Sequence, residues 1–132
     1  ASATALIRMT KAAMEKHPQS AMHSIAAENG GVDGRTAFLA QQQGDAAGSA
    51  VVAEYVHYLS IGVANIVNVF FPEVVAVSGG VSNQGENLLA PLRQAVSQQE
   101  YGAAYTTRHP RILRCILGND AGVIGAALFT EE

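Results

Sequence analysis

This 132-residue sequence lacks the marks of several protein classes. Cys115 is the single cysteine, so no internal disulfide can form, and this fits a reducing cytoplasm. Charged residues make up 14% of the chain, the formal net charge is -3, and there is no basic cluster to attract nucleic acid. The longest apolar stretch, residues 61–71, is interrupted by Gly62, Asn65 and Asn68, short of the roughly 18 to 20 residues of a membrane span. We therefore expect a cytoplasmic protein with no membrane segment and no nucleic-acid partner.

Residues that could form a metal or catalytic site are also sparse. The histidines are scattered, and with one cysteine they show no zinc-binding spacing. There is no serine-centred nucleophile elbow and no arranged pair of carboxylates. We expect neither a metal ligand nor a catalytic residue in this chain; the histidines are His17, His23, His57 and His109.

What the chain does have is the composition of a globular protein, with 48% hydrophobic residues and a length that allows one domain at most. It begins at Ala1 without a methionine, and the apolar spacing of Leu6, Met9, Ala13 and Met14 predicts a helix that starts at once. We interpret the chain as a piece of a longer protein. The alternative is ordinary processing of a complete small protein.

Stop signals divide the first third of the chain into helices. A helix over residues 2–17 should end at Pro18, because proline cannot continue it. A short helix over residues 20–28 should end at the Asn-Gly-Gly of residues 29–31, which suits a helix C-terminus.

Two more helices are predicted from their capping residues. Asp33 or Thr36 could cap a helix over residues 36–43, and Asp45 is placed to cap the next one. That helix is long and should end at Pro72. Its apolar residues fall on one stripe at 3.6-residue spacing, namely Val52, Tyr55, Val56, Leu59, Val63, Ile66, Val67 and Phe70.

The apolar period then changes to that of strands. Residues 74–78 form a short β-branched run that suits a strand buried on both faces, and residues 111–117 form a second, imperfectly alternating run. Between them, a helical face includes Pro91, which should kink the helix or mark its true start. That face consists of Leu88, Leu89, Leu92 and Val96.

The resulting order predicts an α/β fold. Helical segments occupy residues 1–43, and residues 44–132 alternate as helix, strand, helix, strand, helix. Such alternation implies parallel strands joined by right-handed crossovers. Ligands bind beyond the carboxyl ends of such strands, so Gly79-Gly80 and residues 118–120 should edge one crevice.

The sequence VVAVSGGVSNQG, residues 74–85, is the first candidate binding element. Gly79 and Gly80 lack a Cβ, so they can adopt positive φ and let a ligand approach the main chain. The pattern is neither the GxGxxG nor the GxxxxGK[ST] phosphate loop. A tight strand-to-helix turn without a ligand remains the alternative.

The final helix is the second candidate element. Asn119 or Asp120 can cap it, and Gly122, Gly125 and Ala126 leave one side bare, which predicts close packing against another backbone. For Asp120 we favour a plain cap over a catalytic role.

Two asparagines near the end of the long helix, Asn65 and Asn68, could contact a ligand. We favour a structural role for them, in which they satisfy backbone groups at a helix end.

These stretches resemble a known family. NIVNVFFPEVVAVSGGVSNQGENLLAPLRQAV followed by ILGNDAGVIGAALF is similar to the C-terminal part of ROK-family sugar kinases, and of bacterial glucokinases in particular. ASATALIRMTKAAMEKHP and VDGRTAFLAQQQGD resemble helical segments earlier in the same lobe, so the resemblance spans the whole chain. It implies an actin-like, RNase H-like fold of two lobes, in which three antiparallel strands precede the two strands expected here.

The resemblance also implies a role for the glycines. Gly79 and Gly80 would match the adenosine-side loop, with Ser82 and Asn83 at the start of the following helix region. The parent protein would phosphorylate glucose or a related hexose with ATP and Mg, and would form a homodimer. The family's phosphate loop, catalytic aspartate, sugar-contacting glutamate and Cys/His zinc motif would all lie upstream of Ala1. The chain alone should therefore be inactive, and should not form a self-sufficient monomer.

Two other identities compete with the kinase. A ROK-type transcriptional repressor shares this lobe and senses sugar without phosphorylating it, and a helix-turn-helix upstream would favour it. The other competing identity is a dimerisation module without catalytic activity. SGGVSNQG and LGNDAGVIGAA favour the kinase.

Overall fold

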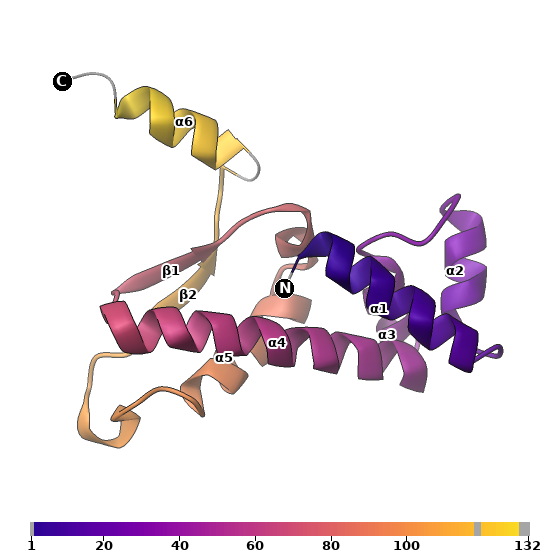
Figure 1. Cartoon of the computed structure of the whole chain (residues 1–132), viewed down its shortest axis with the longest axis horizontal. Coiled ribbons are helices and arrows are strands. Elements are labelled where there is room, and N and C mark those ends of the chain that lie inside the picture. Colours follow the sequence, from indigo (N-terminus) through magenta and orange to yellow (C-terminus); the bar gives the residue numbers. More distant parts are fainter. Residues whose placement is uncertain (1, 118–119, 130–132) are drawn as a thin grey trace.

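The computed structural model describes residues 2–117 and 120–129 of the chain (Figure 1). Helices dominate it and two short strands form a small sheet. The helices are α1 (Ala3–Lys16), α2 (Met22–Glu28), α3 (Thr36–Gln42), α4 (Ala46–Phe70), α5 (Glu86–Ser97) and α6 (Ala121–Leu128). The strands are β1 (Val74–Val77) and β2 (Arg111–Arg114), and the 3-10 turns are η1 (Gly80–Gln84) and η2 (Ala103–Tyr105). The order of elements agrees with the sequence prediction.

Local capping sets the ends of the early helices. Ser2 accepts a hydrogen bond from the backbone N–H of Ala5 at the start of α1. Asp33 and Thr36 were predicted as alternative caps of α3, but Arg35 holds the N-cap position without a side-chain capping bond, and the two residues bond to each other at the start of the helix. The Asp33 carboxylate accepts from the Thr36 N–H, and the Thr36 hydroxyl accepts from the Asp33 N–H. This reciprocal pair satisfies donors that the helix itself cannot.

Asp45 caps α4, as predicted, and also fastens α2 to it. Its Oδ1 accepts from the Gly48 N–H at 2.6 Å and from the Ser20 hydroxyl at 3.0 Å, and its Oδ2 accepts from the Ala21 N–H at 2.9 Å. Burial raises the pKa of Asp45, but these hydrogen bonds outweigh burial and leave that pKa below its ordinary value. The charged carboxylate is therefore the form that the fold stabilises.

Replacing Asp45 with alanine should lower the free energy of unfolding at pH 7 by about 2 kcal/mol, since a helix cap and a tertiary tie are lost together. Because the folded pKa is depressed, the contribution of Asp45 is present above its unfolded pKa of about 3.9 and disappears as the pH falls through the folded value. Urea unfolding of wild type and variant at neutral and acid pH measures this convergence.

Asp120 provides the matched control for that experiment. It occupies the N-cap position of α6, but its side chain makes no capping hydrogen bond there. This corrects the prediction that Asp120 serves as a plain side-chain cap. Asp120→Ala should change the free energy of unfolding by less than about 0.5 kcal/mol. A loss equal to that of Asp45→Ala would contradict the assignment of Asp45 as the anchoring cap.

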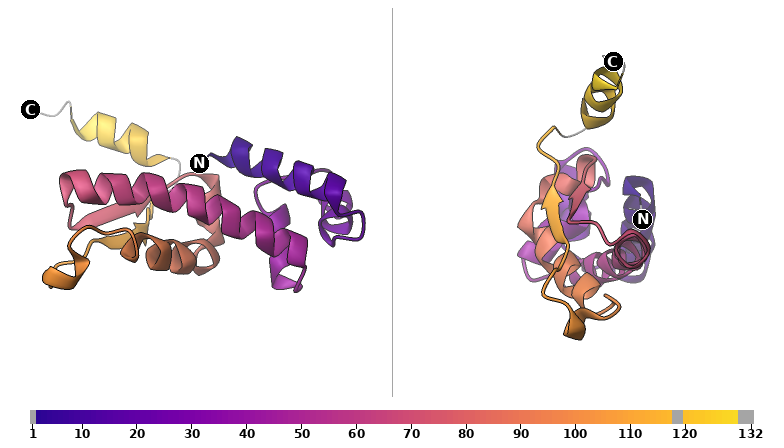
Figure 2. Two further views of the ribbon diagram at one scale, coloured as in Figure 1. Left: turned by 60° about the horizontal axis from the view of Figure 1, so that its bottom comes forward. Right: turned by 90° about the vertical axis from the view of Figure 1, so that its left-hand side faces the viewer.

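The helix α4 is the spine of the structure, and α1, α3 and α5 pack against it (Figures 1 and 2). Five members of the predicted stripe are buried, and Leu59 is half-buried. The prediction is wrong for Ile66 and Phe70, whose side chains are not buried; these residues are 47% and 74% exposed. The buried side near this end of α4 is formed by Val63, Ala64 and Val67, which pack with α5 residues.

By length and apolar composition alone, α4 could also cross a membrane. This differs from the expectation that no segment is long enough, because Gly62, Asn65 and Asn68 do not interrupt the helix. Of its most apolar window, 44% is buried inside the structure. A helix that carries the main core meets the same criteria, so α4 is weak evidence for a membrane segment.

The two strands pair in parallel, as predicted, with Val75 opposite Ile112 and Val77 opposite Arg114. Both are shorter than the predicted runs, ending at Val77 and Arg114. One face carries Val75, Val77 and Ile112 against α4 and α5. The expectation of burial on both faces is not met, because Val74, Ala76 and Leu113 on the other face are exposed within this chain.

The helix α5 starts at Glu86 and continues through Pro91, so the alternative in which it begins only at Pro91 is wrong. All four residues of its predicted apolar face are buried. Leu88 joins the larger core between α1, α3 and α4. Leu89, Leu92 and Val96 form a second core with the end of α4 and Ile112 of β2.

The helix α6 stands away from the rest of the chain in the views of Figures 1 and 2. A Cβ built at Gly122 or Gly125 would meet no atom within 4 Å. The bare side of α6 therefore does not pack against another backbone within the described residues, and the close packing expected for it stays a prediction. Any partner for it must come from outside this part of the chain.

Candidate functional site

The glycine turn, residues 78–85, leaves the carboxyl end of β1 and leads into α5. Gly79 has φ 90° and ψ 169°, a conformation that is essentially restricted to glycine. Gly80 does not have positive φ, so only one of the predicted pair needs glycine for its backbone. No atom lies within 4 Å of a Cβ built on either residue. Both glycines thus have open space beside the main chain.

Ser82 holds the turn together from inside. Its hydroxyl donates to the Gly79 carbonyl at 2.7 Å, and its N–H donates to the same oxygen at 3.0 Å. The residue is only 1% exposed. Because its hydroxyl hydrogen is engaged within the turn, Ser82 stabilises the shape of the loop; its contact with a nucleotide stays a prediction.

Asn83 lies on the exposed side of the turn and is held from a neighbouring strand. Its Oδ1 accepts a hydrogen bond from Arg114 Nη2 at 2.6 Å, across 31 positions of sequence. Sequence reasoning missed Arg114. Arg114 lies in the middle of the predicted strand, residues 111–117, and the signal that could have found it is a charged residue within that apolar run.

The glycine turn lies beyond the carboxyl ends of parallel strands, as the order of elements predicted. Val81 anchors it in the larger core, with a side-chain carbon 3.8 Å from a Cβ built on Gly34. The second predicted edge of the crevice involves Gly118 and Asn119, which lie outside the described residues.

Asn68 has the structural role favoured from the sequence. Its Nδ2 donates to the Gln99 carbonyl at 3.0 Å, and its Oδ1 accepts from the Tyr101 N–H at 2.8 Å. The side chain thereby fastens the end of α4 to the loop after α5. The backbone groups it satisfies belong to this distant loop and not to its own helix end.

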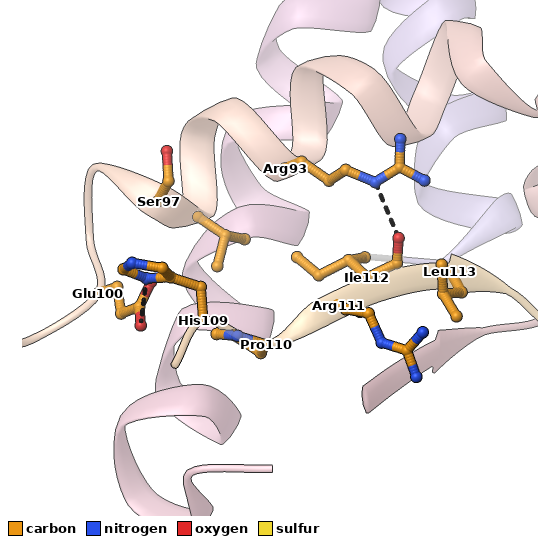
Figure 3. A pocket seen from close by; sticks show the side chains of 9 residues that line it. Arg93, Ser97, Glu100, His109, Pro110, Arg111, Ile112 and Leu113 are labelled. Atoms are coloured by element: carbon orange, nitrogen blue, oxygen red, sulfur yellow. Dashed lines mark hydrogen bonds and ion pairs between the residues drawn. The ribbon is translucent and has the colours of Figure 1, made fainter. Parts of the chain in front are cut away.

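A cavity of about 410 Å³ lies between α5 and the first part of β2 (Figure 3). Arg93 Nε donates to the Ile112 carbonyl at 2.8 Å, and His109 Nδ1 lies 3.1 Å from a carboxylate oxygen of Glu100, whose side chain is 2% exposed. These contacts brace the loop before β2. The cavity extends to the amino end of β2, whereas the glycine turn follows the carboxyl end of β1, so the two are separate features.

Titratable chemistry is sparse around the turn. Among the residues that the structure describes, no group of three or more His, Cys, Asp or Glu side chains could hold a metal ion. The groups with shifted pKa values lie in the helical part. Burial raises the pKa of Tyr55; for Asp33, burial opposes the hydrogen bonds from Arg35 and Thr36, and these prevail and lower the pKa. Within the described ranges, the arrangement offers an open backbone surface and one cation, Arg114, while the Glu86 carboxylate after the turn is ion-paired with Arg93.

Comparison with known proteins gives consistent results. The ROK family model matches residues 1–132. A glucokinase from Halalkalibacterium halodurans is 30% identical over the whole chain, which covers 39% of that protein. A ROK family glucokinase from Streptomyces griseus, solved in complex with glucose and AMPPNP, is 30% identical with a TM-score of 0.83, covering 98% of this chain and 42% of the other. A xylose repressor from Caldicellulosiruptor bescii is 33% identical over 50% of this chain.

The fold prediction is confirmed by this likeness. The chain has the architecture of part of an actin-like kinase lobe, rich in helices and with two parallel strands. It spans about two fifths of the length of the two glucokinases it matches.

Proposed function

The chain belongs to the ROK family, and from this premise we propose that it forms part of an ATP-dependent kinase of glucose or a related hexose. In this proposal the glycine turn is the adenosine-side loop, and α6 is the helix that packs across the hinge between the two lobes. The phosphate loop, catalytic base, sugar contacts and zinc site belong to the rest of the protein.

The observation that carries the proposal is the open glycine turn at the carboxyl end of β1. Gly79 adopts a conformation that side chains do not tolerate, and Gly80 has free space beside its backbone. Other exposed glycines of the chain also have open space beside them, and what distinguishes this turn is its position beyond the carboxyl end of a parallel strand, where such sheets bind ligands. The matching glucokinase structure was solved with AMPPNP, which supports nucleotide binding in this family.

The chain's own residues would bind and orient the nucleotide. ATP with Mg would supply the phosphoryl group. Gly79 and Gly80 would let the adenosine approach the main chain. Ser82 would keep the turn in shape through its bond to the Gly79 carbonyl, and Asn83 would present its remaining amide group on the exposed side.

Replacing Gly80 with valine in the full-length protein tests this role. The new side chain would occupy the space that the ligand needs, so the KM for ATP should rise about tenfold, equivalent to about 1.4 kcal/mol. The fold should be retained, because Gly80 has neither positive φ nor a neighbour within 4 Å. Steady-state kinetics with varied ATP and varied hexose measures the effect.

Gly62 provides the control, because it lies on the exposed side of α4 and also has no neighbour within 4 Å of a built Cβ. Gly62→Val should leave the KM for ATP unchanged. If Gly80→Val behaves in the same way, the glycine turn is a simple connection and the proposed nucleotide role is wrong.

A repressor lobe that senses sugar is the second candidate, and the match to a xylose repressor favours it. A helix-turn-helix and operator binding by the full-length protein would support this candidate, and hexose phosphorylation would support the kinase. For either identity we propose a cytoplasmic homodimer, in which a second copy or the remaining chain covers apolar surface. The dimerisation module is the same proposal without catalysis.

A further inference from the structure

Arg114 occupies a junction between the sheet and the glycine turn. It is the last residue of β2, and in the parallel register it lies opposite Val77, the last residue of β1. Because side chains alternate along a strand, Arg114 shares a face with Ile112, which is 3% exposed. Its side chain therefore starts on the helix-covered face, at the point where the strand ends and the turn passes.

The contact that Arg114 makes reaches the turn itself. Nη2 donates to Asn83 Oδ1 at 2.6 Å, a charge-assisted hydrogen bond between two exposed side chains. Neither residue belongs to an apolar core, so packing does not explain the contact.

Two other contacts hold the glycine turn, and both lie on sides of the turn other than the one that Arg114 reaches. Ser82 closes the turn on the Gly79 carbonyl, and Val81 is buried in the larger core. Arg114 adds a tie from the adjacent strand.

We propose that Arg114 is a positioning residue for nucleotide binding, which holds the glycine turn in its open shape through the Arg114–Asn83 hydrogen bond. The proposal rests on the proposed function, since it takes the turn as the nucleotide site. Arg114 acts through Asn83 and does not contact the nucleotide itself.

The test compares Arg114→Ala, Asn83→Ala and the double variant in the full-length protein. Arg114→Ala should raise the KM for ATP about fivefold, and Asn83→Ala should raise it by at least as much because its own amide group is lost too, with kcat and the KM for hexose unchanged. The double variant should show no more than the larger single effect, because both changes break one contact. Arg114→Lys, which keeps a donor but not the planar fork, should cause a smaller rise. Arg111→Ala, on the opposite face of β2, is the control and should leave the KM for ATP unchanged.

A second measurement separates positioning from direct contact. In the nucleotide-free protein, amide hydrogen exchange of residues 79–85 should become about fivefold faster in Arg114→Ala and remain unchanged in Arg111→Ala. Unchanged exchange in Arg114→Ala would overturn the proposal, and a raised KM without faster exchange would mean that Arg114 contacts the nucleotide directly. Faster exchange with an unchanged KM would support the positioning of the turn and contradict the proposed function.

Discussion

Residues 1–132 expressed alone should leave ATP and glucose unconverted. The carboxylate nearest to the glycine turn in sequence, Glu86, is ion-paired with Arg93, and the described residues include no cluster that could hold a metal ion. One side of a nucleotide site can bind and orient, but phosphoryl transfer also needs groups that position the phosphates and the attacking hydroxyl. The chain spans about two fifths of the glucokinases that it matches. A coupled assay for ADP should read background.

The control is the full-length protein in the same assay, with turnover in the typical range of roughly 1 to 1000 per second. Turnover of that size by the isolated chain would contradict the prediction. Light scattering of the preparation should also show dimers or larger species instead of a 13.8 kDa monomer. The reason is uncovered apolar surface, such as Ile116 and Phe129 at 98% and 91% exposure, together with a sheet that has two parallel strands among the residues the structure describes.

Replacing Gly48 with alanine should destabilise the protein by about 2 kcal/mol, because the α3–α4 contact has no room for a methyl group. A Cβ at Gly48 would lie 2.7 Å from Ala40 Cβ and 3.0 Å from the Ala37 carbonyl oxygen, so backbone and side chain would both have to move. The better helix propensity of alanine, worth about 1 kcal/mol, would offset only part of the overpacking.

Gly62 is the matched control, since it lies in the same helix with nothing within 4 Å of its built Cβ. Gly62→Ala should raise the free energy of unfolding by up to about 1 kcal/mol. Thermal or urea unfolding of the full-length variants should therefore give shifts of opposite sign. Shifts of the same sign and size would show that α3 and α4 do not approach closely at Gly48.

Much of the fold could be predicted because its causes are local. Ser2 and Asp45 cap helices through hydrogen bonds to N–H groups three residues ahead, and such bonds depend only on neighbouring residues. The change from helical to strand period gave the order of elements, and that order gave the parallel pairing. The glycine turn was also visible in the sequence, although its role in binding stays a prediction.

Predictions of which apolar residues are buried and which are exposed were less accurate. Ile66 and Phe70 continue the apolar pattern of α4 but face outward, since the buried side is set by where α5 and β2 pack. The exposed face of the two strands and the open sides of Gly122 and Gly125 have the same cause, because no other element among the described residues covers them. Burial depends on which elements are present to cover a face, and a periodic pattern does not contain that information.

By itself, the sequence determined the order of the helices and strands and the approximate bounds of the helices, whereas both strands end earlier than the apolar runs that predicted them. Only the tertiary structure decided which distant groups meet. Asp45 binds Ser20 and Ala21 in addition to its own helix, Arg114 reaches Asn83 across 31 positions, and Glu100 is buried beside His109. The physical reason is that capping and periodicity act within one or two turns of the chain, whereas these contacts form only after packing has brought separate elements together.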